Sequence, residues 1–167
     1  HMPSRRQRQM CIRDRLQDQF HELPDTAVVA EQIPAYKSKA SHRAYYSPPP
    51  ISNKRPGIVY FNLRDIRSQA FTNTATLAYH EGIPGHHTQY AISRSLTELP
   101  TFRRFNRNSA YMEGWAQYAE QLAFESGLLD DPIDRLGYFQ LELLRIARLV
   151  IDTGLHHKRW TREASIE

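Results

Sequence analysis

Apolar residues recur at helical spacing through most of the chain beyond about residue 70. The spacing of three and four residues predicts a helix over residues 74–96, because positions so spaced lie on one helical face. Pro84-Gly85 interrupts this segment, and proline both lacks an amide donor and clashes with the carbonyl four residues back. We therefore expect the helix to kink or to break at this step.

Two further helices follow, each with its own start and stop signals. Asn108 or Ser109 can cap the first, and Gly127 can end it. Asp131-Pro132 joins a capping residue to a proline at the first helical position, and the helix it opens runs toward Gly154. The apolar stripes that we expect to face the core are Tyr111, Trp115, Tyr118, Ala119, Leu122 and Ala123 in the first helix, and Leu136, Phe139, Leu143, Ala147 and Val150 in the second.

The segment from residue 20 to residue 57 carries many prolines and little periodicity, so we expect extended chain and loops there. Residues 57–63 (GIVYFNL) are rich in β-branched and aromatic side chains and form the best strand candidate. A lone strand is not stable, so Tyr45-Tyr46 or another subunit must supply its partner. The pattern predicts a mainly α-helical fold with a small β element near residues 57–63.

The first 16 residues differ in composition from the rest. They carry the whole net charge of +4, in a cluster of arginines, and they hold the only cysteine, Cys11. His1-Met2 and residues 9–15 resemble cloning and sequencing remnants, so we expect residues 1–16 to be a non-native or disordered leader. Residues 17–167 then form a single, partial domain. The competing interpretation, a basic arm that binds nucleic acid, lacks aromatic or glycine-rich companions.

The composition is that of an ordinary globular domain, with 167 residues of which 40% are hydrophobic and 24% charged. No apolar run approaches the roughly 18 residues that a membrane helix needs, and no signal peptide is visible. No cysteine follows the leader, which excludes disulfides and thiolate zinc sites there. We expect a cytoplasmic rather than a secreted protein, without a membrane or nucleic-acid partner.

A dense group of metal-binding side chains lies at residues 80–87, where the sequence reads HEGIPGHH. His80, His86 and His87, together with Glu113 further along, offer the imidazole and carboxylate ligands of a hydrolytic zinc site with one position open for water. Glu81 adjoins the first histidine and can take the proton of that water. An isolated histidine is more often structural than a ligand, but the joint pattern predicts a Zn²⁺ centre.

The sequence leaves open whether His86 or His87 joins His80 at the metal. On a straight helix His87 returns to within about 20° of His80 after a rise of about 10.5 Å, whereas His86 lies about 120° away. A bulge or a restart at Pro84-Gly85 could instead bring His86 into line. The other histidine would then support a ligand or lie near the substrate.

Three ordered blocks resemble a bacterial family known as domain of unknown function 885, whose members are regarded as zinc peptidases. The blocks are residues 76–89 (TLAYHEGIPGHHTQ), 111–120 (YMEGWAQYAE) and 148–156 (RLVIDTGLH), within a likeness that spans roughly residues 20–167. The family in turn resembles the gluzincin peptidases, which include mostly helical members.

This resemblance implies a helical, gluzincin-like metallopeptidase core. It implies His80, one of His86 and His87, and Glu113 as metal ligands, with Glu81 as the general base. Family members are much longer than this chain, which therefore looks similar to a fragment from the C-terminal region of one.

Other side chains could assist at the site. His156, in the third block, could donate a hydrogen bond to the oxyanion of a tetrahedral intermediate, or it could face the dipole at the end of its helix. Tyr90, Tyr111 and Tyr118 could take the same catalytic role, although an aromatic residue at helical spacing is more often part of the core.

Two arginines could bind the substrate. Arg145 and Arg148 could grip a substrate carboxylate with two parallel hydrogen bonds. The more frequent arrangement is a structural ion pair, for which Glu113, Glu120 and Asp152 are the candidate partners.

The combined pattern predicts zinc-dependent hydrolysis of amide bonds in small peptides, with Glu81 moving a proton from water to the leaving amine. The alternative is a non-catalytic fragment that keeps the metal but lacks a substrate cleft. Such a fragment would expose apolar surface, so we expect a homo-oligomer. A third interpretation, nucleic-acid binding through the leader, predicts salt-sensitive binding that is lost without residues 1–16.

Overall fold

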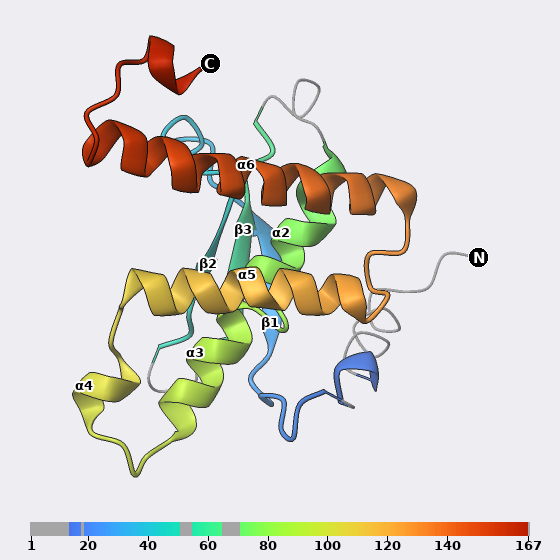
Figure 1. Ribbon diagram of the computed structural model, residues 1–167. Coiled ribbons are helices and arrows are strands. Elements are labelled where there is room, and N and C mark those ends of the chain that lie inside the picture. The colour runs from blue at the N-terminus through green and yellow to red at the C-terminus, as the bar shows by residue number, and fades with distance from the viewer. Residues whose placement is uncertain (1–13, 18, 51–54, 65–70, 167) are drawn as a thin grey trace.

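The computed structural model describes residues 14–17, 19–50, 55–64 and 71–166. Helices dominate it, and a small three-stranded sheet lies beside them (Figure 1), which confirms the prediction of a mainly α fold. The predicted leader lies outside the described residues except for residues 14–16. There Leu16 is fully buried, and Arg15 donates a 2.6 Å hydrogen bond to the carbonyl oxygen of Gly127. The division of the chain at residue 17 stays a prediction.

The sheet has the strand order β1-β3-β2. β2 runs antiparallel to β3 and pairs Tyr45 with Tyr60, so the predicted partner of this strand is confirmed. β1 runs parallel to β3 on its other side, a strand that we did not expect, because its ladder depends on a partner far along the chain. The strands are β1 Val28–Gln32, β2 Ala44–Ser47 and β3 Gly57–Phe61.

The helical segment predicted over residues 74–96 breaks at Pro84-Gly85, which confirms the expected interruption, and forms two helices, α2 and α3, separated by a turn at residues 82–85. The expected caps are confirmed: Asn108 accepts a hydrogen bond from the amide of Tyr111, and Asp131 accepts one from the amide of Ile133. The helices are α2 Thr74–Glu81, α3 His86–Ser95, α4 Thr101–Arg104, α5 Ser109–Glu125 and α6 Pro132–His156, with the 3₁₀ turns η1 Phe71–Asn73 and η2 Glu163–Ser165.

α2 is the central element of the molecule. It contacts α3, α5, α6 and β2, so it joins the helices to the sheet. In Figure 1, α5 and α6 cross in front of α2 and the strands, while α3 and α4 extend to one end. The end of α2 is therefore a point from which side chains can reach three other elements.

The buried face of α5 differs from the predicted stripe. Ala119 and Ala123 are buried as expected, but Tyr111 and Tyr118 are 65% and 50% exposed. Glu120, which lies outside that stripe, is fully buried. Because Ala119 and Ala123 are small, α2 can pack closely against this face of α5. The remaining space holds polar side chains such as Glu120, which the periodicity of apolar residues would assign to the surface.

The predicted stripe of α6 also faces outward. Leu136, Phe139, Leu143 and Val150 are 49–67% exposed, whereas Gly137 meets η1 so closely that a Cβ would lie 1.8 Å from the carbonyl oxygen of Thr72. Beyond residue 142 the charged residues Arg145, Arg148 and Asp152 recur at helical spacing on one face. Arg145 on that face forms an ion pair with Glu120 of α5, so the apolar stripe is turned away from this contact.

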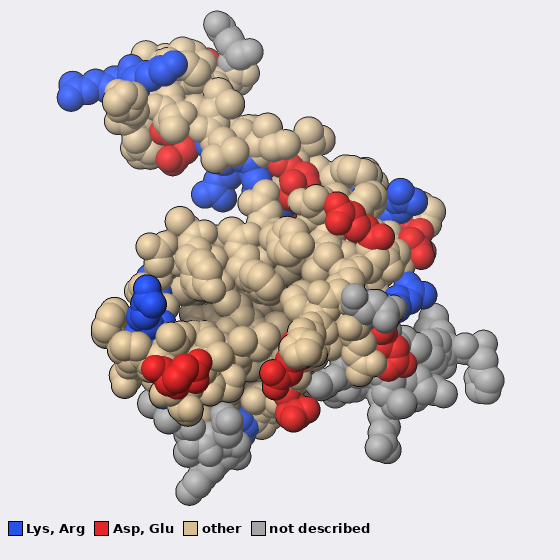
Figure 2. Space-filling view, turned by 60° about the horizontal axis from the view of Figure 1, so that its bottom comes forward, with Lys and Arg blue, Asp and Glu red and all other residues tan. Residues whose placement is uncertain are grey.

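The charged side chains form no large patch of one sign on the face shown in Figure 2, where acidic and basic groups lie mainly toward the margins of an uncharged centre. Among the described helices, none combines the length and the apolar character needed to cross a membrane.

Candidate metal centre

The break between α2 and α3 positions two of the predicted ligands. His80 lies in the last turn of α2, and His86 is the first residue of α3. Between them, the amide of Gly85 donates a 3.0 Å hydrogen bond to the carbonyl oxygen of Tyr79. A Cβ at residue 85 would lie 1.9 Å from the carbonyl oxygen of His80, so only glycine lets the chain turn back this tightly. Both histidines thus face α5.

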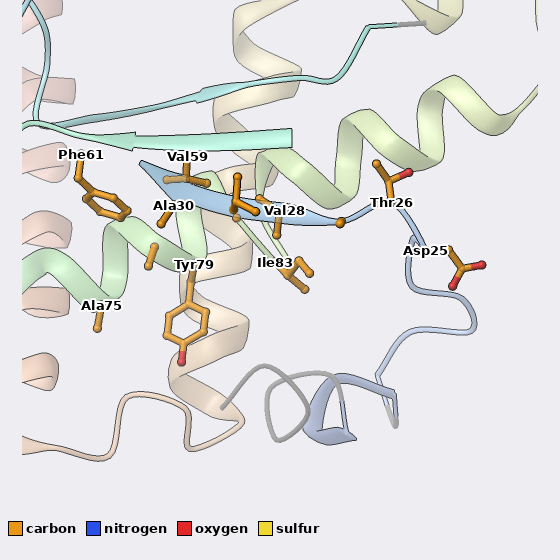
Figure 3. Close-up of a pocket in the computed structure, with 13 residues that line it drawn as sticks. Asp25, Thr26, Val28, Ala30, Val59, Phe61, Ala75, Tyr79 and Ile83 are labelled. Atoms are coloured by element: carbon orange, nitrogen blue, oxygen red, sulfur yellow. The ribbon is translucent and has the colours of Figure 1, made fainter. Parts of the chain in front are cut away.

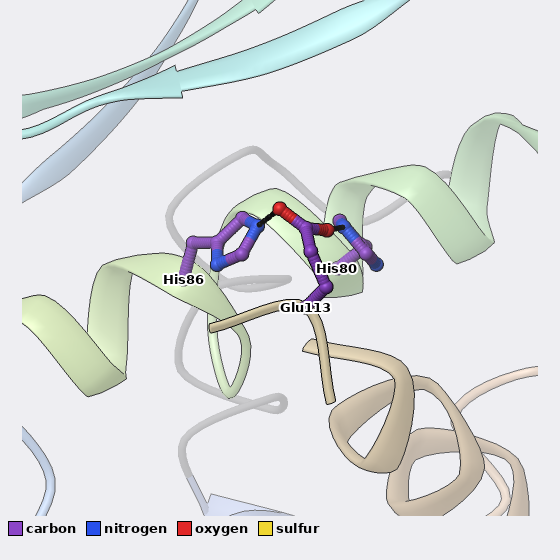
Figure 4. A group of neighbouring side chains, drawn as sticks. All are labelled: His80, His86 and Glu113. Carbon is purple, nitrogen blue, oxygen red and sulfur yellow. Dashed lines mark ion pairs between the residues drawn. The ribbon is translucent and has the colours of Figure 1, made fainter. Parts of the chain in front are cut away.

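Glu113, from the second turn of α5, lies between the two imidazoles (Figure 4). Its Oε2 is 3.4 Å from Nε2 of His80, and its Oε1 is 3.7 Å from Nε2 of His86. One ligand atom from each of the three side chains lies within 4.8 Å of the other two. Tetrahedral ligands of Zn²⁺ are about 3.4 Å apart at typical bond lengths. The group therefore fits one such ion after a small inward movement.

The ring of His80 is held on its other side by Glu120. Nδ1 of His80 is 2.6 Å from Oε1 of Glu120, which is fully buried. Because a carboxylate can only accept, Nδ1 donates this hydrogen bond, and Nε2 is the nitrogen that faces Glu113. Arg145 of α6 forms a two-armed ion pair with Glu120, so the structural ion pair expected for this arginine is confirmed.

His86 lies beside a neutral side chain, that of Gln89, rather than a carboxylate. Its Nδ1 and the side-chain oxygen of Gln89 are both buried without a hydrogen bond to another described residue, and the Gln89 side chain favours protonated His86. The amide nitrogen of Gln89 donates to the carbonyl oxygen of Tyr111 at 3.2 Å, which ties this side chain to the start of α5. Nε2 of His86 is again the nitrogen that faces Glu113.

The two histidines differ in charge. Burial lowers the pKa of His86 to about 4, and the neighbouring His80 lowers it further. Burial also opposes the charge of His80, but hydrogen bonds to Glu113 and Glu120 outweigh it and raise the pKa to about 9. The hydrogen bond to His80 in turn lowers the pKa of Glu113. At pH 7 a proton on His80 thus occupies the space between imidazole and carboxylate that a cation would take.

Glu81 lies beside the group and is only 7% exposed. Burial raises the pKa of its carboxyl group, while the positive charge of His80 and a hydrogen bond from the backbone amide of Tyr46 oppose that rise. A buried carboxylate with a raised pKa and a fixed orientation suits proton transfer at neutral pH.

His87 lies outside the group. Its Nε2 is 2.8 Å from the carbonyl oxygen of Thr26, and its Nδ1 is 2.9 Å from the hydroxyl of Tyr46. The carbonyl can only accept, so Nε2 carries the hydrogen and Nδ1 accepts from the hydroxyl. Both ring nitrogens are occupied in linking α3 to the sheet. Of the two histidines that the sequence left open, the structure brings His86 to His80 and Glu113.

The structure does not bring His156 into the group. Its side chain is 78% exposed at the end of α6 and lies 3.6 Å from Asp152. Tyr90 does border the site, since its ring centre is 6.4 Å from that of His86 and its hydroxyl contacts the sulfur of Met112. The other candidates named from the sequence occupy exposed positions, namely Tyr111, Tyr118 and Arg148.

Two cavities lie near these elements. One, of about 520 Å³, separates β1 from α2, and apolar side chains such as Val28, Val59 and Ile83 point into it (Figure 3). None of its lining residues belongs to the metal group. The other, of about 550 Å³, is bounded by α3, α4 and the start of α5 and includes Gln89 in its wall. Gln89 lies one turn from His86 on α3, so this second cavity is near the metal group, although none of the three ligands lines it.

Comparisons with known proteins place these features in context. A family model described as "Bacterial protein of unknown function (DUF885)" matches residues 3–167. The search of curated proteins gives no match. Among solved structures, the chain is similar to one described as a "putative lipoprotein" from Colwellia psychrerythraea, with 40% sequence identity and a TM-score of 0.87 over 95% of this chain. The chain covers 27% of that protein's length.

Proposed function

The chain belongs to the family of bacterial proteins of unknown function DUF885, and we propose that its metal centre binds zinc and hydrolyses amide bonds in small peptides. The observation that carries this proposal is the convergence of His80, His86 and Glu113 from three helices. Two imidazoles and one carboxylate, with a further position open, are the protein ligands of many hydrolytic zinc sites.

The surroundings of the three side chains support a metal rather than a purely structural cluster. Nδ1 of His80 donates to Glu120, and the Nε2 atoms of both histidines are directed at Glu113. His86 stays neutral at pH 7, as a ligand must. Glu113 is 61% exposed, so a substrate can approach the group from the side of this carboxylate.

Zinc bound at this site would polarise the scissile carbonyl group and acidify water. Glu81 would accept the proton of the attacking water and then deliver it to the leaving amine. Its burial keeps the proton within the site between these two events, and the amide of Tyr46 holds the carboxylate in place.

The cavity that includes Gln89 in its wall supports a small substrate. Its volume of about 550 Å³ suits a short peptide better than a folded chain. Ile92, Leu96 and Trp115 give it apolar walls, which favour an apolar side chain next to the cleaved bond.

The direct test compares zinc content and hydrolysis of a dipeptide panel in two variants. Glu81→Gln should retain zinc and lose turnover, because the amide cannot take a proton. Glu98→Gln, at an exposed position of the same residue type, should match the unmodified chain. Full activity in Glu81→Gln would overturn the mechanism.

The alternative is a non-catalytic, self-associating metal-binding fragment. The exposed leucines and valine of α6 favour it, since apolar surface of this kind is normally covered. It predicts zinc bound in stoichiometric amount, no turnover of any dipeptide, and a sedimentation coefficient that rises with protein concentration.

The location of the protein is a separate proposal. The Colwellia psychrerythraea relative is described as a lipoprotein, which favours the cell envelope over the cytoplasmic location expected from the sequence. Fractionation of cells that produce the relative distinguishes membrane-bound from soluble protein.

A further inference from the structure

We propose that Arg145 of α6 is a positioning residue for the metal centre, acting through Glu120 on His80, so that the docking of α6 sets the affinity for metal. This inference rests on the metal centre of the proposed function. It concerns a residue that contacts none of the three ligands by a described hydrogen bond or ion pair.

The first step is the contact between Glu120 and His80. Glu120 is fully buried, and its Oε1 is 2.6 Å from Nδ1 of His80. A charged acceptor at Nδ1 fixes the ring orientation and makes Nε2 a stronger ligand. The metal affinity of His80 therefore depends on the Glu120 carboxylate staying in place against Nδ1.

The second step is the neutralisation of that buried charge. Nη1 of Arg145 donates to Oε2 of Glu120 at 2.7 Å, and Nη2 donates to Oε1, the same oxygen that accepts from His80. A buried carboxylate without a partner takes up a proton or turns away. Glu142 receives a further 3.0 Å hydrogen bond from Nη1, which orients the guanidinium on α6.

The third step is that Arg145 belongs to a different helix from any ligand. Its helix contacts η1 and α2, and Gly137 in its first half lies against Thr72 of η1, while beyond residue 142 its leucines and valine are largely exposed. The ion pair with Glu120 therefore joins a sparsely packed part of α6 to the metal group. Coupling of this kind is reciprocal, so a bound metal should also stabilise the seating of α6.

The experiment measures zinc affinity of the full chain by chelator competition, together with the visible spectrum of the Co²⁺-loaded form. Arg145→Met should weaken zinc binding by about 10–100-fold, as is typical when a group that supports a ligand is lost. Arg145→Lys should recover part of the loss, because lysine keeps the charge but cannot form both hydrogen bonds. Arg148→Met, an exposed position one turn along the same helix, should match the unmodified chain in affinity and spectrum.

A double-substitution cycle separates positioning from general destabilisation. Glu120→Gln removes the buried charge, so in that background Arg145→Met should fold and should change zinc affinity less than twofold. Additive losses would overturn the proposal, and so would unmodified affinity in folded Arg145→Met. If the unmodified chain bound no zinc at all, the proposed metal centre would be refuted as well. If the unmodified chain and Arg145→Met bound zinc equally, only the role of Arg145 would be refuted.

Discussion

At the junction of α2, α3 and α5, polar side chains such as Glu120 and His87 are buried with hydrogen-bond partners, whereas along the second half of α6 apolar side chains are exposed. Glu120 and His87 have no exposed surface, yet each forms hydrogen bonds at more than one atom. Leu143 and Leu149, by contrast, are 67% and 71% exposed. Each region reverses the usual rule that polar groups face water and apolar groups do not.

The two reversals have different physical meanings. A polar group is buried without a large loss of stability only where specific partners replace water, so the junction requires particular residues at particular distances. Exposed apolar residues need no specific partner and indicate only that this surface favours contact with another. Chemistry is therefore expected at the junction, and association along α6.

The largest expected effect distinguishes the two adjacent histidines of the junction. His86→Ala removes a ligand and should weaken zinc binding by more than about 100-fold, beyond the loss typical of a supporting group. His87→Ala should bind zinc as before but lower the free energy of unfolding by about 2–4 kcal/mol, because it opens a cavity and leaves buried groups unpaired. Zinc titration and chemical denaturation of both variants check these effects. Loss of zinc binding in His87→Ala but not in His86→Ala would contradict the proposed ligands.

A leucine pair tests the contrast in packing. Leu129 is 1% exposed, and Leu129→Ala should lower the free energy of unfolding by about 2–5 kcal/mol. Leu143→Ala, the same chemical change on α6, should alter it by less than about 0.5 kcal/mol. Urea denaturation of the metal-free chain measures both, and equal losses would mean that α6 is packed more tightly than its exposure indicates.

The pH dependence of metal binding tests the charge state of the junction. The pKa of His80 is raised to about 9, so a cation must displace its proton at neutral pH. Apparent zinc affinity should therefore rise about tenfold from pH 7 to pH 8 and level off above about pH 9. Competition with a chelator of known protonation constants measures this slope, and an affinity independent of pH would contradict it.

The last prediction places charges on the exposed face of α6. Leu143→Glu combined with Val150→Glu should change the free energy of unfolding by less than about 1 kcal/mol, because both side chains are exposed. The same substitutions should abolish the self-association proposed for the unmodified chain. Sedimentation equilibrium over a range of concentrations checks this, and persistence of the oligomer would place its interface elsewhere.

Much of the fold could be predicted from local signals. Asn108, Asp131 and the Pro84-Gly85 step act on the backbone beside them, so caps and breaks follow from residue type alone. The strand at residues 57–61 and its partner at Tyr45 could likewise be predicted, because aromatic and β-branched residues are concentrated there.

The remaining features depend on partners distant in sequence. β1 is defined by its pairing with β3, and Glu120 is buried only because His80 and Arg145 meet it there. A tally of apolar positions assigns such a glutamate to solvent. A carboxylate seven residues after a predicted carboxylate ligand was the available signal, since that spacing places both on one helical face.

The choice between His86 and His87 shows the same limit. Both follow the glycine that restarts the helix, and their sequence positions alone do not reveal which ring faces α5. The decision comes from Tyr46 and Thr26, which engage both nitrogens of His87.

Zinc-edge X-ray absorption of the chain loaded with one equivalent of zinc tests the metal centre most directly. Scattering from two imidazole rings and a carboxylate oxygen at about 2.0–2.2 Å is the expected result. It should persist in His87→Ala and fall to one imidazole in His86→Ala. A shell of water oxygens without imidazole scattering, or a spectrum that does not change in His86→Ala, would contradict the assignment of His80, His86 and Glu113.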